Sequence, residues 1–273
     1  MDANRQTVLS SARSYAYDDY LAALFSPYEM REDLFCLSAY YGELARISLT
    51  VKEDILAQIR FQWWRDTLER GVSTGYPIAD KLLKLHVKKK IPVETLLSLL
   101  EQRARELDPQ FLSTTETIQA SLKTMEIPHF KARAILLGCP LDTKLEDLLA
   151  EACPILGAVR LCLRLPSILA RRATLARQEQ FHPISEEGVE QNIQRLSSAP
   201  FIETLVPKIK SDYLDLRNDL RALEDNYRIL FLPLALVPSY LKVLQEGSAQ
   251  NKKTPLPLVR LLSLFLSAKL GWF

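Results

Sequence analysis

Apolar residues recur at steps of three and four along most of the chain, which is the period of an α-helix and not of a strand. In the segment 27–47, the apolar positions Leu34, Tyr41 and Ala45 fall on one helical face. The Ser26-Pro27 pair before them is typical of a helix start, with serine as the capping residue. This pattern predicts a long helix over 27–47 with one face in the core.

The same periodicity, interrupted by capping residues and prolines, predicts helices to the end of the chain. No internal repeat, low-complexity tract or linker separates them, so we expect an all-α fold in a single domain, 1–273. The polar stretch 246–254 is expected to be a loop. The further predicted helices cover residues 52–70, 80–90, 92–107, 113–125, 130–137, 143–164, 167–180, 189–196, 201–227, 229–245 and 258–273.

Composition narrows the class of protein. Hydrophobic residues make up 48% of the chain and only 8 residues are glycine, which favours a helical globular core. The net charge of +2 is too small for a typical duplex nucleic-acid binder. The cysteines form no C-x-x-C pair, so we expect reduced core thiols at Cys36, Cys139, Cys153 and Cys162.

The most specific motifs lie between residues 26 and 70. They are Arg31 near the start of an apolar helix, the step Ala39-Tyr40-Tyr41, and the run Gln62-Trp63-Trp64-Arg65-Asp66. Together they resemble the squalene/phytoene synthase family. Residues 101–108 are similar to the family's R-x-x-D-L element. The run from Leu163 to Arg172 resembles a divergent branch that includes alphaproteobacterial synthase-like proteins and a mitochondrial assembly factor for respiratory complex I.

The resemblance covers about residues 13–273 and implies an isoprenoid synthase-like helical bundle with a central cavity. It places helices 27–47 and 143–164 on opposite sides of that cavity. The candidates for lining the cavity or binding an anion are Arg31, Tyr41, Trp64, Arg65, Arg164 and Arg171. Trp63 and Trp64 point about 100° apart on a helix, so we expect at least one of them in the core.

The family's metal motifs are missing. In the family, a D-x-x-x-D motif after the aromatic step holds Mg²⁺ against a prenyl diphosphate, but the run from Ala45 to Leu49 reads A-R-I-S-L. Glu43 lies about 160° around the helix from Ala45 and does not replace the motif. Between Ala152 and Gln178 there is no Asp or Glu for a second cluster. Because Mg²⁺ needs hard oxygen ligands, we predict no metal site, no cofactor and no catalytic residue.

Five arginines occupy the region of the second cluster: Arg160, Arg164, Arg171, Arg172 and Arg177. The favoured interpretation is a helical hairpin whose long side chains cover apolar surface. The alternative is an anion site in which Arg164 and Arg171 face the cavity and bind a phosphate or phospholipid head group directly. The D-x-x-x-D run at Asp215–Asp219 is interpreted as a solvated helix face, with a metal site as the alternative.

The apolar segment 258–273 has two interpretations as well. It is expected to pack on the bundle as a final helix. The alternative is an interfacial helix with Arg260 and Lys269 at lipid head groups and Trp272 in the interface.

The resemblance therefore implies a non-catalytic protein that acts in respiratory complex I assembly, or in a related membrane-peripheral scaffold or lipid-binding role. The alternative is a prenyl diphosphate-using transferase of isoprenoid biosynthesis. The expected partners are a protein, an anionic lipid or both, with a prenyl diphosphate under the alternative and no nucleic acid. We expect a cytoplasmic location in a bacterium, or one peripheral to the inner membrane (on the matrix side in a mitochondrion).

Overall fold

Helices form every regular element in the described part of the chain, which in this computed structural model is residues 3–51, 53–89, 91–108, 111, 115–178, 199–246 and 254–273. The predicted all-α class is confirmed. The elements are α1 (Ala3–Tyr15), α2 (Tyr17–Ala23), α3 (Tyr28–Thr50), α4 (Asp54–Arg70), α5 (Pro77–Lys89), α6 (Val93–Ala104), η1 (Arg105–Leu107), α7 (Thr115–Thr124), α8 (Ile127–Leu137), α9 (Thr143–Gln178), α11 (Ala199–Arg221), α12 (Asp225–Phe231), η3 (Leu232–Leu236), α13 (Val237–Gln245) and α14 (Pro257–Leu270).

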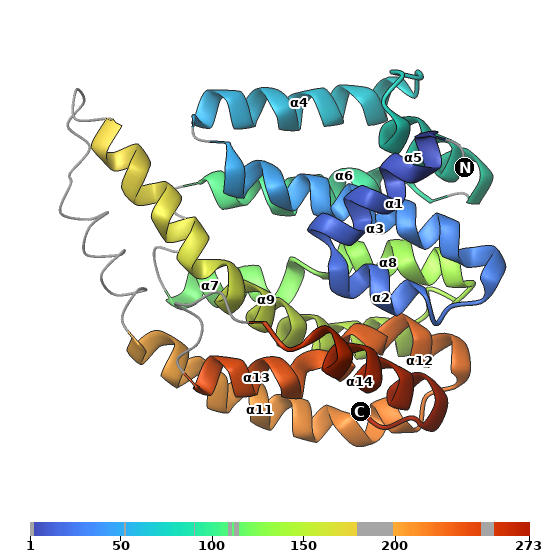
Figure 1. Cartoon of the computed structure of the whole chain (residues 1–273), viewed down its shortest axis with the longest axis vertical. Coiled ribbons are helices and arrows are strands. Elements are labelled where there is room, and N and C mark those ends of the chain that lie inside the picture. The colour runs from blue at the N-terminus through green and yellow to red at the C-terminus, as the bar shows by residue number, and fades with distance from the viewer. Residues whose placement is uncertain are drawn as a thin grey trace.

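The helices form two groups with α9 between them (Figure 1). In the N-terminal group, α3 contacts α1, α2, α4, α5, α6 and α8. In the C-terminal group, α11 and α13 pack against α9, and α14 packs against η3, α12 and α2. Helix α4 lies at the top of the view, and α11, α13 and α14 lie at the bottom.

Helix α3 is the centre of the N-terminal group because its middle is buried on all sides, from Leu34 to Leu44. Gly42 lets the end of α1 approach it closely. A Cβ at this position would lie 2.8 Å from the Cβ of Tyr15 and 3.0 Å from its carbonyl carbon. Only glycine allows α1 and α3 to pack at this distance.

Several predicted boundaries were wrong. Helix α9 continues through Pro166, where the sequence had suggested a break, because packing on both sides supports the turn that lacks one backbone hydrogen bond. The helix predicted over 201–227 ends at Arg221, and α12 begins at Asp225 after a turn. Arg228 Nη2 donates to the Leu223 carbonyl at 3.0 Å and so stabilises that turn.

Two further differences concern the N-terminal helices and a helix cap. Helices α1 and α2 were not predicted from the sequence. Helix α3 begins at Tyr28 with Pro27 as the capping residue and no side-chain cap, so the serine cap was wrong. The predicted helix 189–196 lies outside the described residues. All four cysteines are reduced and buried, as expected.

The stretch Asp225–Gln245 is long and apolar enough to cross a membrane, but 67% of its most apolar window is buried inside the protein. Leu230, Phe231 and Leu234 are fully buried there. This stretch is therefore part of the core.

Candidate functional site

A pocket of about 380 Å³ lies where α3 and α9 face each other. Both helices predicted to border the central cavity line it, together with α2 and the end of α6. The lining residues include Tyr15, Asp18, Asp19, Tyr41, Ala45, Arg46, Leu49, Arg103, Arg160 and Arg164. Ala45, Arg46 and Leu49, which replace the first aspartate cluster, therefore do face this pocket.

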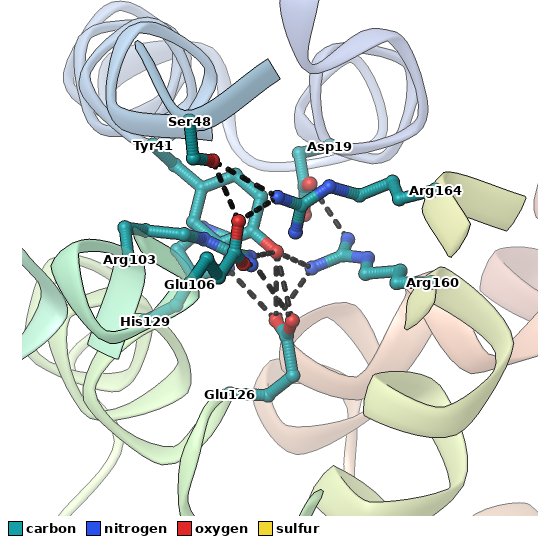
Figure 2. Close-up of polar contacts among 9 residues, drawn as sticks. All are labelled: Asp19, Tyr41, Ser48, Arg103, Glu106, Glu126, His129, Arg160 and Arg164. Atoms are coloured by element: carbon teal, nitrogen blue, oxygen red, sulfur yellow. Dashed lines mark hydrogen bonds and ion pairs between the residues drawn. The ribbon is translucent and has the colours of Figure 1, made fainter. Parts of the chain in front are cut away.

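A buried network of arginines and carboxylates lies beside the pocket (Figure 2). Glu126, just before α8, is fully buried. Its carboxylate accepts a hydrogen bond from Arg160 Nη1 at 2.6 Å, from Tyr41 Oη at 2.8 Å and from Arg103 Nη2 at 3.3 Å. Burial alone would raise the pKa of Glu126, but the positive charges of Arg160 and Arg103 lower it well below its ordinary value. Glu126 is therefore an anion in the core.

Glu106 in η1 is the second buried carboxylate. It accepts hydrogen bonds from Ser48 Oγ at 2.6 Å, from Arg103 Nη1 at 2.7 Å and from Arg164. Desolvation opposes its charge, but Arg164 and Arg103 lower its pKa below the ordinary value. Arg103 thus bridges the two buried glutamates.

Asp19 in α2 is the third acid of the network. Its Oδ2 accepts from Arg160 Nη2 at 2.7 Å, and its Oδ1 lies 3.6 Å from Arg133 Nη1. Arg160 therefore joins α9 to both α2 and the start of α8. These hydrogen bonds are strong, because a guanidinium donor and a carboxylate acceptor form short, directional, charge-assisted bonds.

Tyr41 and His129 complete the network. The Tyr41 hydroxyl donates to Glu126 and accepts from Arg103 and from Arg160, the latter at 2.9 Å. Burial raises the pKa of Tyr41, so the hydroxyl keeps its proton. His129 stacks on the Tyr41 ring at 4.2 Å, and burial lowers its pKa, so the imidazole is neutral.

Every charged side chain that lines the pocket is paired with another residue of the chain. The pairs are Asp18 with Arg260, Asp19 with Arg160, Arg46 with Glu43, Arg103 with Glu106 and Glu126, and Arg164 with Glu106. The guanidinium groups of the pocket wall are thus neutralised by carboxylates, which for Arg103, Arg160 and Arg164 come from other elements and for Arg46 from its own helix α3. Arg160 and Arg164 of α9 form such pairs and Arg171 pairs with Asp54, an outcome that neither interpretation of the arginine stretch had included.

The six candidate residues do not gather at one place. Tyr41 and Arg164 line the pocket. Arg171 donates to the Val51 carbonyl at 2.9 Å and pairs with Asp54 at the start of α4. The other three stabilise neighbouring structure: Arg31 donates to the Ser26 carbonyl at 2.9 Å, Arg65 pairs with Glu101, and Trp64 is buried edge-on against Tyr40 with ring centroids 4.9 Å apart.

Sequence reasoning missed most members of the network. Glu126 and Asp19 were not singled out, although each is an acid inside an apolar helical segment. Arg103 and Glu106 lie three residues apart in the R-x-x-D-L-like element, and that spacing was a usable signal. Arg160 was recognised only as one of five arginines, because the sequence does not show which guanidinium reaches a carboxylate on another helix.

The comparisons with known proteins agree with this geometry. The sequence model of the squalene/phytoene synthase family matches residues 12–126, which contain α2, α3 and the R-x-x-D-L-like element. This part of the chain is therefore similar to the family. Squalene synthase HpnC from Alicyclobacillus acidocaldarius has the same fold, with a TM-score of 0.63, 17% sequence identity, and coverage of 93% of this chain and 95% of that one.

The similar curated proteins carry a different name. The chain is 24% identical over 267 residues to "NADH dehydrogenase (ubiquinone) complex I, assembly factor 6" of Bos taurus, covering 92% of this chain and 78% of that protein. The Homo sapiens protein of the same name is 29% identical over 103 residues, or 37% of this chain and 31% of that protein.

The residues of the pocket do not fit the Mg²⁺ that the chemistry of the squalene/phytoene synthase family implies. Magnesium needs carboxylate oxygens that are free to coordinate it. The acids at the pocket, Asp18 and Asp19, are held by Arg260, Arg160 and Arg133. Within the described residues, no group of three or more His, Cys, Asp and Glu side chains could hold a metal ion. The donor set of the pocket is that of an ion-pair network.

Proposed function

We propose that this synthase-fold protein is non-catalytic and acts in the assembly of respiratory complex I by binding a protein partner. The proposal is supported by the similarity to assembly factor 6 along nearly the whole chain. It extends to a location peripheral to the inner membrane, on the cytoplasmic side in a bacterium or the matrix side in a mitochondrion.

The neutralised pocket carries the non-catalytic half of the proposal. The diphosphate group can leave the prenyl chain only when its negative charge is compensated, which the family achieves with Mg²⁺. Here the described carboxylates at the pocket are committed to arginines. A diphosphate that bound Arg160 and Arg164 instead would separate them from Glu126 and Glu106. Breaking a buried ion pair leaves an uncompensated charge and costs about 3–5 kcal/mol, so the fold itself opposes such a ligand.

The transferase alternative is tested directly with the purified protein. We expect no squalene- or phytoene-type product from labelled farnesyl or geranylgeranyl diphosphate in the presence of Mg²⁺. An active synthase of the family, assayed in parallel, shows that the substrates and extraction work. Product above the no-enzyme blank would refute the non-catalytic assignment.

The assembly role is tested by deleting the gene in its own organism. We expect less complex I on native gels and slower NADH-linked respiration, while succinate-linked respiration stays normal. The wild-type gene should restore both. So should Ala45→Leu, which fills part of the pocket and replaces no residue of an ion pair. Normal complex I in the deletion strain would refute the role, and failure of Ala45→Leu alone would show that the pocket binds a required ligand.

A further inference from the structure

The C-terminal helix α14 is apolar on the side that faces away from the bundle. Leu258, Leu262 and Phe265 are 75%, 55% and 47% exposed, and Trp272 just after the helix is 60% exposed. Steps of four and three place Leu258, Leu262 and Phe265 on one stripe of the helix, and Trp272 follows its end. We call the outward face of α14 the surface formed by Leu258, Leu261, Leu262, Phe265, Lys269 and Trp272.

The opposite side of α14 is fixed to the bundle. Leu264 and Ser267 are fully buried. Arg260 Nη1 donates to Asp18 Oδ1 at 3.0 Å, and its Nε donates to the Pro255 carbonyl at 2.9 Å. Packing of the final helix on the bundle is therefore confirmed, and Arg260 is held away from any lipid head group. Because the inward face is anchored, α14 cannot rotate to bury its outward face.

The charges on this segment select the kind of surface that covers it. From Thr254 to Phe273 the chain contains no Asp or Glu, and its charged side chains are the buried Arg260 and the exposed Lys269. A surface helix of a soluble protein normally presents polar residues outward. An apolar stripe with a lysine and a terminal tryptophan instead matches a helix that lies in the head-group region of an anionic membrane.

We infer that the outward face of α14 rests on an anionic membrane, with its leucines and Phe265 among the upper acyl chains and Lys269 at the head groups. The inference deepens the membrane-peripheral part of the proposed function by naming the surface that makes the contact. A lipid surface needs no matching groove, so a single convex helix can dock on it.

A second copy of the chain fits this face less well. Helix α14 has 14 residues, which gives a length of about 21 Å and, at a width of about 10 Å, a contact of roughly 200 Å² per partner. Stable interfaces bury about 800 Å² per partner. The face is thus too small to hold a dimer by itself.

The test is sedimentation of the purified full chain with vesicles. We expect it to bind vesicles of phosphatidylcholine and phosphatidylglycerol, and to bind vesicles of phosphatidylcholine alone more weakly. The double variant Leu262→Gln and Phe265→Gln should lower the binding constant about 30-fold, which corresponds to ~2 kcal/mol. The single variant Lys269→Glu should remove the preference for the anionic vesicles.

Helix α4 offers a matched control. Its Ile55 and Ile59 are 64% and 59% exposed, at the other end of the molecule from α14 (Figure 1). The double variant Ile55→Gln and Ile59→Gln loses a comparable amount of apolar surface and should bind vesicles like the wild type. Circular dichroism and the melting temperature establish that both variants fold.

Four outcomes would overturn the inference. The first two are that the wild type does not sediment with vesicles, or that it binds both vesicle types equally. The other two are that the α14 double variant binds vesicles as tightly as the wild type, or that the α4 and α14 double variants lose equal amounts of vesicle binding. A concentration-dependent dimer that only the α14 variant abolishes, without vesicle binding, would assign the face to a second copy. These results are separate from those for the proposed function. A chain that binds vesicles but is not needed for complex I refutes only the assembly role.

Discussion

Replacing Glu126 by glutamine tests whether the buried network holds the fold together. The substitution keeps the shape of the side chain but removes a negative charge that three groups share: Arg160, Arg103 and the Tyr41 hydroxyl. The carboxamide can still accept one or two hydrogen bonds. It can no longer compensate the guanidinium charges in a site that solvent does not reach.

The expected loss in the free energy of unfolding depends on which carboxylate partners Arg160 and Arg103 keep. Removing one partner of a buried pair typically destabilises by about 3–5 kcal/mol. Arg160 keeps Asp19, and Arg103 keeps Glu106. We therefore expect the lower end, a loss of ~3 kcal/mol in the free energy of unfolding. At about 2 °C per kcal/mol for a chain of this size, the melting temperature should fall by roughly 6 °C.

The assay is urea unfolding followed by circular dichroism at pH 7, with Glu146→Gln as the control. Glu146 pairs with Lys131 at 3.3 Å on the surface, with its side chain 60% exposed. An exposed pair contributes little, so this variant should lie within about 0.5 kcal/mol of the wild type. If Glu126→Gln is as stable as the control, the network does not stabilise the fold and the argument against a diphosphate ligand loses its basis.

Three further predictions concern pH, packing and thiol reactivity. Burial lowers the pKa of His129 in the folded state, so the free energy of unfolding should fall as the pH drops below the ordinary histidine value of 6.5. It should fall more steeply below pH 4.5, because the folded state also lowers the pKa values of Glu126 and Glu106. Unfolding curves from pH 8 to pH 3 measure this dependence, and a flat profile would contradict it. Gly42→Ala should destabilise the protein by about 1–3 kcal/mol, because the new methyl group would lie 2.8 Å from the Cβ of Tyr15. Gly157→Ala should change the melting temperature little, because its methyl group would meet the flexible side chain of Met125 at 3.2 Å. Similar shifts in melting temperature for the two variants would refute the close approach of α1 and α3. All four cysteines should resist a thiol reagent in the folded protein and react fully in urea, because each is buried. Rapid reaction of any thiol in the native protein would disprove the packing described.

The elements with strong periodicity could be predicted from the sequence, and those that depend on tertiary contacts could not. The helix over 27–47 and the Gly71 end of α4 were recognisable, because apolar spacing and a left-handed glycine are local signals. Pro166 suggested a break that packing overrides. The split at Leu223 depends on a side chain that reaches back to a carbonyl group, which no local pattern records.

The site shows the same division. The missing aspartates at positions 45 and 49 could be read directly from the motif. Their consequence could not, because it depends on which carboxylate meets which arginine across helices that are up to 141 residues apart in sequence. Arg164 was assigned to the cavity and does line it, whereas the sequence does not show that its partner is Glu106 of the R-x-x-D-L-like element. Pairing in space is a property of the fold and not of any segment.

The arginines in the wall of the pocket also limit how a metal site could arise there by mutation. Ala45→Asp or Leu49→Asp would place a carboxylate in a pocket walled by Arg160 and Arg164, where it would be captured by a guanidinium before it could hold a metal ion. Removing either arginine first would weaken the compensation of a buried glutamate. Each single step toward metal binding therefore passes through a less stable protein or a neutralised acid, and building a metal site in this pocket would require several coordinated substitutions.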